Sequence, residues 1–289
     1  MSRLLGIGAC QIETDPDDIR KNMKSLKTQV KIMRAHSPWI QLVCAPELCL
    51  HGPYRMASSA EPIPGPISEQ CAAIARELDI YLIPGSIYEK EGAAIYNTAP
   101  IFNPKGELIN KYRKMYPWRP HEKTVSGNQT AVFEIPGVGK VGVCICYDLW
   151  FPEVIRDLIW KGAEVIMIPT FTGTQDREQE LILTRAAAIA NQCFIASING
   201  LGRNAKGQSM LVDPEGNVMQ MTGQVPENMI AMLDLDRVDQ VRRYGTCGVS
   251  RPLASFFHEA HRFPHQDLDP KNRSQKAYRF PIEDTKNDE

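Results

Sequence analysis

The amino-acid sequence predicts an α/β fold with mixed sheets. Segments with the pattern of strands alternate with segments of helical periodicity almost throughout, and several successive strands are joined by short turns typical of hairpins. Because hairpins occur among β-α-β units, the sheets should contain both parallel and antiparallel neighbours. No shift in composition and no flexible linker divides the chain. We therefore expect a single domain over residues 1–265 and a polar tail over residues 266–289, which is either a loose end or an arm on a partner subunit.

The first half of the chain contains most of the predicted first sheet. Apolar residues at Leu4–Ile12 predict a buried strand, and residues 17–33 show the spacing of an amphipathic helix. A turn at Asn103–Gly106 gives the strands on either side of it a hairpin character. The remaining elements expected here are strands at 40–47, 80–89, 94–103 and 107–116 and a helix at 68–79.

The second half repeats the same alternation. Residues 131–148 hold two strands around a Pro-Gly turn. Helices are expected at 151–162 and 176–192, where apolar residues recur at helical spacing. The remaining strands are predicted at 163–170, 193–200, 208–216 and 229–236.

Composition and charge exclude several classes of protein. The chain has 289 residues, 43% of them hydrophobic, and a net charge of −1, so neither nucleic acid nor a membrane surface is an expected partner. The start lacks the features of a signal peptide, and no apolar run is long enough for a membrane helix. Eight cysteines without an export signal are expected to be reduced thiols, which favours a cytoplasmic protein.

No metal or other cofactor is expected. The chain has no C-x-x-C pair, the basic feature of zinc-ribbon and thioredoxin sites. His258, His261 and His265 could form a metal cluster, but Pro264 breaks any helix that would align them. We interpret this stretch as a polar C-terminal segment.

Three reactive side chains stand at the ends of three predicted strands. Glu47 ends "LVCAPE", Lys114 ends "LINKYRK", and Cys146 ends "GVCIC". Ligands of open α/β sheets gather outside the carboxyl ends of strands. These three residues are therefore the first candidates for a catalytic site.

Two cysteines compete for the role of nucleophile. Alternation along a strand places Cys144 and Cys146 on the same face, so the pattern alone does not separate them. Cys144 has apolar neighbours and is most simply a small core residue. Cys146 precedes a turn and a helix starting near Phe151, where a helix N-terminus favours a thiolate. With Glu47 as base and Lys114 as oxyanion donor, it would complete an acyl-transfer site without histidine.

The segments around these residues resemble the motifs of the nitrilase superfamily of carbon–nitrogen hydrolases. "CAPELCLHGPY" is similar to the glutamate motif, "KYRKMYPWRPHE" to the lysine motif and "VGVCICYDLWFPEVIRDLIWKGAEVIMIPT" to the cysteine motif. The resemblance covers roughly residues 4–255, with the three motifs in the expected order. It implies a four-layer α-β-β-α sandwich with two mixed central sheets. It also implies subunits that pair through helices into a homodimer or a higher homo-oligomer.

The same resemblance assigns catalytic roles to residues of this chain. It implies that Glu47 is the general base, Lys114 the oxyanion stabiliser and Cys146 the nucleophile, which decides between the two cysteines. The backbone N–H of Tyr147 would be a second oxyanion donor. Glu122, eight residues after Lys114, matches a further glutamate that positions the substrate and the lysine.

The expected reaction is hydrolysis of a primary amide to a carboxylic acid and ammonia through a cysteine thioester. The "YRKMYPWRPHE" stretch resembles short-chain aliphatic amidases and formamidases, although those carry a small residue in place of Arg119. An inward Arg119 would bind the carboxylate of an N-carbamoyl amino acid, whereas an outward one would be a surface arginine. Trp150 and Phe171 are expected to wall the acyl pocket beside Tyr147. The alternatives are an N-carbamoyl amino acid or amine hydrolase, a nitrilase, and a catalytically silent binding protein of the same fold.

Overall fold

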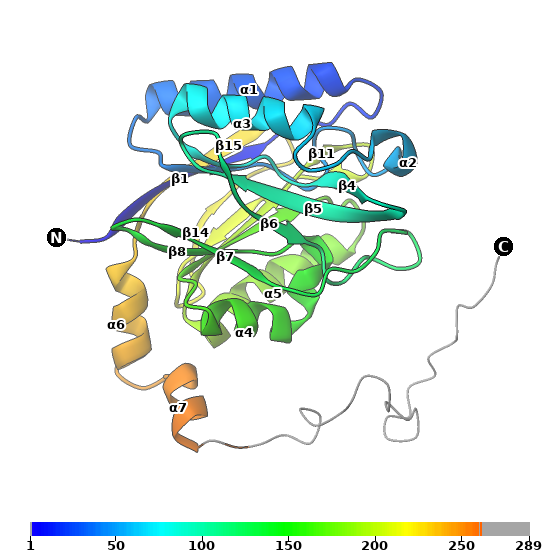
Figure 1. The fold of residues 1–289 in the computed structure, drawn as a ribbon. Helices are drawn as coiled ribbons and strands as arrows, with labels where there is room; N and C mark the ends of the chain where they lie inside the picture. Colours follow the sequence, from blue (N-terminus) through cyan, green and yellow to red (C-terminus); the bar gives the residue numbers. More distant parts are fainter. Residues whose placement is uncertain (1, 260, 262–289) are drawn as a thin grey trace, which may run out of the picture.

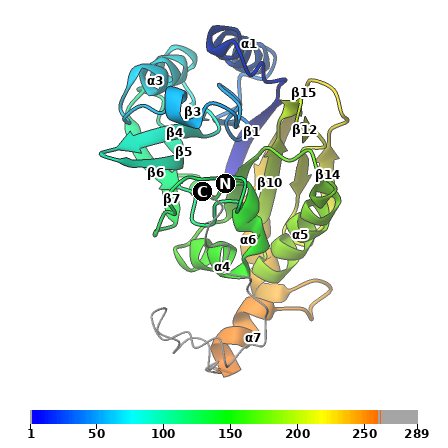
Figure 2. The same cartoon turned by 90° about the vertical axis from the view of Figure 1, so that its right-hand side faces the viewer.

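Two mixed β-sheets pack face to face in the computed structural model, which describes residues 2–259 and 261 (Figure 1). Helices α1 (Ile19–His36) and α3 (Pro66–Leu78) cover the outer face of one sheet, and α4 (Pro152–Trp160) and α5 (Asp176–Asn191) cover the other. Figure 2 shows the same layers from the side. The predicted α-β-β-α sandwich is therefore confirmed.

The first sheet has seven strands in the order β15-β1-β2-β3-β5-β4, with β6 beside β5. Strands β1, β2 and β3 run parallel, and β15, β5, β4 and β6 add antiparallel pairs. The bounds are β1 (Leu4–Gln11), β2 (Leu42–Cys44), β3 (Tyr81–Ile83), β4 (Ile87–Glu91), β5 (Ala94–Phe102), β6 (Leu108–Arg113) and β15 (Glu227–Asp234).

The second sheet has six strands in the order β14-β13-β10-β9-β8-β7. Its three central strands are parallel and its outer strands antiparallel, as in the first sheet. The bounds are β7 (Ala131–Ile135), β8 (Gly139–Val143), β9 (Val165–Thr170), β10 (Phe194–Asn199), β13 (Met210–Val212) and β14 (Val218–Met221). A small hairpin of β11 (Leu201–Gly202) and β12 (Ala205–Lys206) follows β10.

Burial of apolar side chains explains the layering. One apolar cluster fills the space between the sheets and continues beneath α4, and a second lies beneath α1 and α3. Helix α1 begins at an N-cap, where the Asp18 side chain accepts a hydrogen bond from the Lys21 backbone N–H at 2.9 Å. Its buried side chains include Leu26 and Val30, four positions apart, so one face of the helix enters the core.

The predicted strand at 80–89 is wrong in one respect, because it is divided into β3 and β4. Gly85 lies between them with φ +83°, a conformation that favours glycine. A Cβ at this position would lie 1.8 Å from the Pro46 carbonyl oxygen. Gly85 thus allows the β3–β4 loop to approach the segment that carries Glu47.

Several short elements were not predicted from the sequence. They are α2 (Met56–Ser59), β11, β12, β14, α6 (Asp236–Tyr244) and α7 (Pro252–Glu259). In α6 only Val238 and Val241 are buried, so its apolar pattern is too sparse to mark a helix. The predicted boundary at 265, the tail at 266–289 and His265 lie outside the described residues. Within residues 2–259 and 261, no helix combines the length and hydrophobicity that crossing a bilayer requires.

Candidate active site

Glu47, Lys114, Glu122 and Cys146 line one cavity of about 480 Å³. Glu47 follows β2 by three residues and Lys114 directly follows β6, both in the first sheet. Cys146 follows β8 in the second sheet. The cavity therefore lies where strand ends of the two sheets meet, as the strand-end argument predicted.

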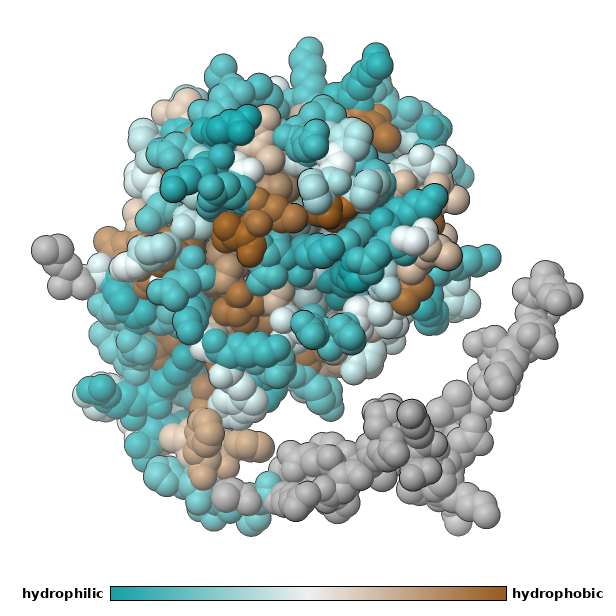
Figure 3. Space-filling model, in the orientation of Figure 1, coloured by the Kyte–Doolittle hydropathy of each residue, from teal (hydrophilic) through white to brown (hydrophobic). Residues whose placement is uncertain are grey.

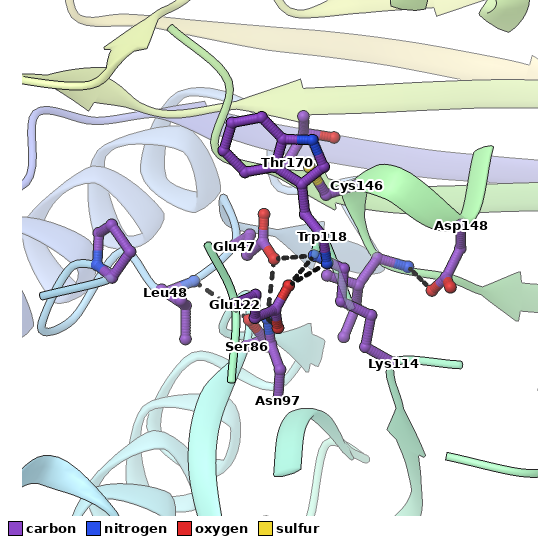
Figure 4. Close-up of polar contacts among 12 residues, drawn as sticks. Glu47, Leu48, Ser86, Asn97, Lys114, Trp118, Glu122, Cys146, Asp148 and Thr170 are labelled. Atoms are coloured by element: carbon purple, nitrogen blue, oxygen red, sulfur yellow. Dashed lines mark hydrogen bonds and ion pairs between the residues drawn. The ribbon is translucent and has the colours of Figure 1, made fainter. Parts of the chain in front are cut away.

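The ammonium group of Lys114 bridges two carboxylates (Figure 4). Its Nζ donates to Glu47 Oε1 at 2.8 Å and to Glu122 Oε2 at 2.7 Å. The amide Nδ2 of Asn97 on β5 joins the same two side chains, at 2.8 Å from Glu47 Oε1 and 2.9 Å from Glu122 Oε1. Two donors shared by two acceptors fix all four side chains in one geometry.

Burial and pairing set the charges of this group. Burial raises the pKa of Glu47, with the nearby Lys114 ammonium opposing the rise. Burial alone would lower the pKa of Lys114, but the acidic groups around it outweigh that effect and raise its pKa well above the usual value. The pKa of Glu122 is lowered, because Lys114 and several hydrogen bonds overcome its burial. The geometry thus supplies a fixed cation beside a carboxylate with raised proton affinity.

The sulfur of Cys146 lies in this cavity at the start of a 3₁₀ helix, η1 (Cys146–Trp150). Cys146 has φ +49°, the left-handed region that a non-glycine residue rarely adopts. This conformation ends the extended chain abruptly, and Sγ lies 3.5 Å from Thr172 Oγ1. The predicted strand through Cys146 is therefore too long, since β8 ends at Val143. Cys144 is fully buried, as expected of a core residue.

The surroundings of Cys146 favour the protonated thiol over the thiolate that a nearby helix N-terminus was expected to favour. Burial raises the pKa of the thiol, and the neighbouring Glu47 carboxylate raises it further. Lys114 and the backbone N–H of Phe171 act in the opposite direction. A nucleophile in this environment requires a base to remove its proton.

Asp148 holds the turn that presents Cys146. Its buried carboxylate accepts hydrogen bonds from the Tyr112 hydroxyl at 2.7 Å and from the backbone N–H groups of Ile145 and Tyr116, each at 2.9 Å. Burial raises the pKa of Asp148 to about 6. Because Tyr112 and Tyr116 flank Lys114 in sequence, Asp148 ties the cysteine turn to the lysine segment.

The predicted pocket residues divide into two groups. Tyr147, Trp150 and Phe171 line the cavity, as expected, with Tyr147 and Trp150 in ring contact at 5.9 Å between centroids. Arg119 does not. It is exposed and donates to the backbone carbonyls of Glu122 and Thr124, so it stabilises the loop that carries Glu122. The interpretation of Arg119 as a substrate-binding residue is corrected on this ground, and the outward alternative fits its position.

Sequence reasoning missed several residues in and around the cavity, including Asn97, Thr172 and Glu180 as well as the lining residues Tyr54, Tyr88, Trp118, His121 and Arg203. Asn97 lies in the middle of a strand, between Tyr96 and Thr98, where the pattern gives no sign of a site residue. Thr172 and Glu180 lie near Cys146, and Thr172 Oγ1 donates to Glu180 Oε1 at 2.9 Å. Among the described residues no cluster of three or more His, Cys, Asp or Glu side chains is arranged to hold a metal ion.

Known proteins with similar sequences and structures are hydrolases of carbon–nitrogen bonds. An omega-amidase of Xenopus tropicalis is 33% identical over 231 residues, which cover 73% of this chain and 83% of the relative. A formamidase of Bacillus cereus is 35% identical over 192 residues, or 64% of this chain and 58% of the formamidase. The chain thus spans little more than half of the formamidase.

Solved structures agree with the sequence comparison. A Saccharomyces cerevisiae member of branch 10 of the nitrilase superfamily matches with a TM-score of 0.77 and 27% identity, covering 84% of this chain and 94% of the other. An amidase from Nesterenkonia sp. matches with a TM-score of 0.72 and 25% identity over the same shares. The carbon-nitrogen hydrolase family profile matches residues 6–243. This chain therefore belongs to the carbon–nitrogen hydrolase family, within the nitrilase superfamily.

Proposed function

We propose that this protein hydrolyses a primary amide to a carboxylic acid and ammonia, with Cys146 as the nucleophile. The observation that carries the proposal is the convergence of Cys146, Lys114 and Glu47 on one cavity. A catalytically silent binding protein would have no need to bury a lysine between two carboxylates beside a thiol.

Acylation begins with removal of the thiol proton. The Glu47 carboxylate takes the proton from Cys146 as the sulfur attacks the amide carbon, so that an S–C bond forms and the C=O π electrons move to oxygen. The Lys114 ammonium stabilises the resulting oxyanion. The Tyr147 N–H is a second donor, because it belongs to the first turn of η1, where N–H groups lack helical partners.

Collapse of this intermediate releases ammonia. Glu47 transfers its proton to the amide nitrogen, the C–N bond breaks, and a thioester remains on Cys146. Water then attacks the thioester while Glu47 accepts a proton from it. The sulfur departs, regains the proton and restores the thiol. Glu122 and Asn97 keep Glu47 and Lys114 in place through both halves of the reaction.

A substrate panel tests the proposed reaction. Ammonia release should be measured with formamide, acetamide and butyramide, with N-carbamoyl alanine, and with butyronitrile. We expect the amides to give the highest kcat/KM, and N-carbamoyl alanine tests whether Arg203, which lines the cavity where Arg119 does not, binds a carboxylate. Amidases related to this chain support the ranking. The absence of turnover with every amide would reject it.

We also propose that two copies of the chain pair through α5. Ile182 and Ile189 on this outer helix are 68% and 49% exposed and stand seven positions apart, on one face. Figure 3 shows further hydrophobic side chains at α7, where Phe257 is 68% exposed. Apolar side chains in such positions are typical of a covered surface.

Light scattering after size exclusion tests the pairing. We expect a dimer for the unmodified protein and a monomer for Ile182→Glu, because a charge would be buried without a partner. Ile32→Glu is the matched control, since Ile32 is also an exposed isoleucine on an outer helix, α1, over the other sheet. A dimer that survives Ile182→Glu would place the interface elsewhere.

A further inference from the structure

Glu180 is a buried carboxylate in the cavity that the proposed reaction does not use. It lies on α5, is 2% exposed and lines the cavity. Its Oε1 lies 4.0 Å from the Cys146 sulfur and accepts the Thr172 hydroxyl. In the described part of the chain, no hydrogen bond or ion pair joins Glu180 to Glu47 or Lys114.

The carboxylate of Glu180 is held in a fixed orientation. Its Oε2 pairs with Arg177 Nη1 at 3.0 Å, and Arg177 is itself 1% exposed. Arg177 also donates to the Ser197 hydroxyl at 3.1 Å and to the Gln208 carbonyl at 2.8 Å. Attraction within a buried ion pair barely offsets the loss of hydration, so apolar residues would stabilise this position at least as well. A role in binding explains why a charged pair is present.

The geometry of the intermediate shows what Glu180 faces. The carbon bonded to the Cys146 sulfur carries three other substituents. The oxyanion is directed to Lys114, and the leaving nitrogen to Glu47. The third substituent is the atom next to the carbonyl carbon. It must point in the direction that the oxyanion and the leaving nitrogen do not take. Thr172 Oγ1 and Glu180 Oε1 lie 3.5 and 4.0 Å from the sulfur and are not hydrogen-bonded to Lys114 or Glu47 in the described part of the chain, so we assign the remaining direction to them.

We infer that Glu180 selects amides that carry a hydrogen-bond donor, a hydroxyl or an N–H group, on the atom next to the carbonyl carbon. This inference rests on the proposed function and narrows its substrate class. A methyl group at that atom would remove water from Glu180 Oε1 without supplying a donor, whereas a hydroxyl would replace the water. A carboxylate there would be repelled by Glu180.

Lactamide and isobutyramide form the matched pair for the experiment. They have equal numbers of non-hydrogen atoms and differ only by a hydroxyl in place of a methyl group at the position in question. We expect kcat/KM to be about 10- to 100-fold higher for lactamide, since sites built to bond a hydroxyl discriminate strongly against its loss.

Variants then assign this preference to Glu180. Glu180→Gln should reduce the lactamide-to-isobutyramide ratio, and Glu180→Met should bring it close to one. Because either variant leaves Arg177 without its carboxylate, the double variant Arg177→Met/Glu180→Met removes both charges and keeps the test valid if the single variants fold poorly. Glu178→Gln on the same helix is the control, because Glu178 is exposed and outside the cavity; its ratio should match that of the unmodified protein.

The outcomes separate this inference from the proposed function. If no amide is hydrolysed, the proposed function fails and the inference falls with it. If amides are hydrolysed but the unmodified protein shows no preference for lactamide, only the inference is overturned. It is equally overturned if the preference persists in Glu180→Met and in the double variant. A purely structural role would lower both kcat/KM values and leave their ratio unchanged.

Discussion

Cys146→Ser is expected to lower kcat with any amide by at least about 10⁴-fold while the fold is retained, as replacement of catalytic nucleophiles does in other hydrolases. A serine hydroxyl ionises at far higher pH than a thiol, and the proposed base is the Glu47 carboxylate. Glu47 is strong enough to deprotonate a thiol at the moment of attack, but not an alcohol. Single-turnover assays and circular dichroism on the same preparation measure both parts of the prediction.

Cys144→Ala is the matched control for this variant. Cys144 lies two residues earlier and is fully buried in the apolar core. We expect it to keep kcat within about twofold, with a stability loss of the order of 1 kcal/mol for the lost side-chain contacts. Cys146→Ser with more than a few per cent of normal activity, or an inactive but folded Cys144→Ala, would contradict the assignment.

Alkylation with iodoacetamide gives a second, independent readout. Among the described residues Cys247 is the exposed cysteine, and Cys146 is 9% exposed through the cavity. Peptide mass spectrometry should therefore find label on both. Only the modification of Cys146 should be slowed by an added amide substrate, because Cys247 does not line the cavity. Protection of Cys144 in place of Cys146 would reverse the roles of the two residues.

The positions of the principal site residues could be predicted because each lies within three residues of a strand end. Lys114 comes immediately after β6 and Cys146 three residues after β8, so local patterns locate both at sheet ends. Asn97, which bonds to Glu47 and Glu122, and Glu180, which lines the cavity, do not stand near strand ends. Asn97 lies within a strand and Glu180 on a helix, where periodicity predicts which face is buried but not which groups that face meets.

The sequence pattern also could not predict where strand β8 ends or which way the Arg119 side chain points. Strand β8 ends at Val143 and Cys146 adopts a left-handed conformation, and a non-glycine residue gives no sign of such a conformation in the sequence. Arg119 was ambiguous for a similar reason. Its direction is set by the backbone carbonyls of Glu122 and Thr124, which become neighbours only when the loop has folded. Tertiary contacts therefore decided both points.

Lys114→Met is expected to impair both catalysis and stability. The loss of the ammonium removes an oxyanion donor, which typically costs about 10²- to 10³-fold in kcat. It also leaves Glu47 and Glu122 buried with Asn97 as a shared donor, and breaking a buried ion pair in this way costs about 3 to 5 kcal/mol of stability. Denaturant unfolding and initial rates measure the two effects separately.

The pH dependence of this variant tests whether Lys114 also sets the pKa of the base, Glu47. Glu47 must be ionised to accept the thiol proton, so activity falls as the pH drops through its raised pKa. Lys114 lowers the pKa of Glu47, and its removal should therefore move the acid limb of kcat/KM to higher pH. Protonation of the stranded carboxyls relieves their charge, so the stability deficit of the variant should shrink as the pH falls.

Lys111→Met is the control that separates stability from catalysis. Lys111 lies three residues earlier on β6 and is likewise the cationic partner of a buried carboxylate, Glu89, which also keeps Arg113. This variant should lose some stability but retain kcat/KM within about twofold per folded molecule, with an unmoved acid limb. If Lys114→Met behaved like Lys111→Met, the buried ammonium would serve the fold alone. If instead only Lys114→Met loses activity and shifts its pH profile, the same ion pair that stabilises the folded chain also sets the proton affinity of its base.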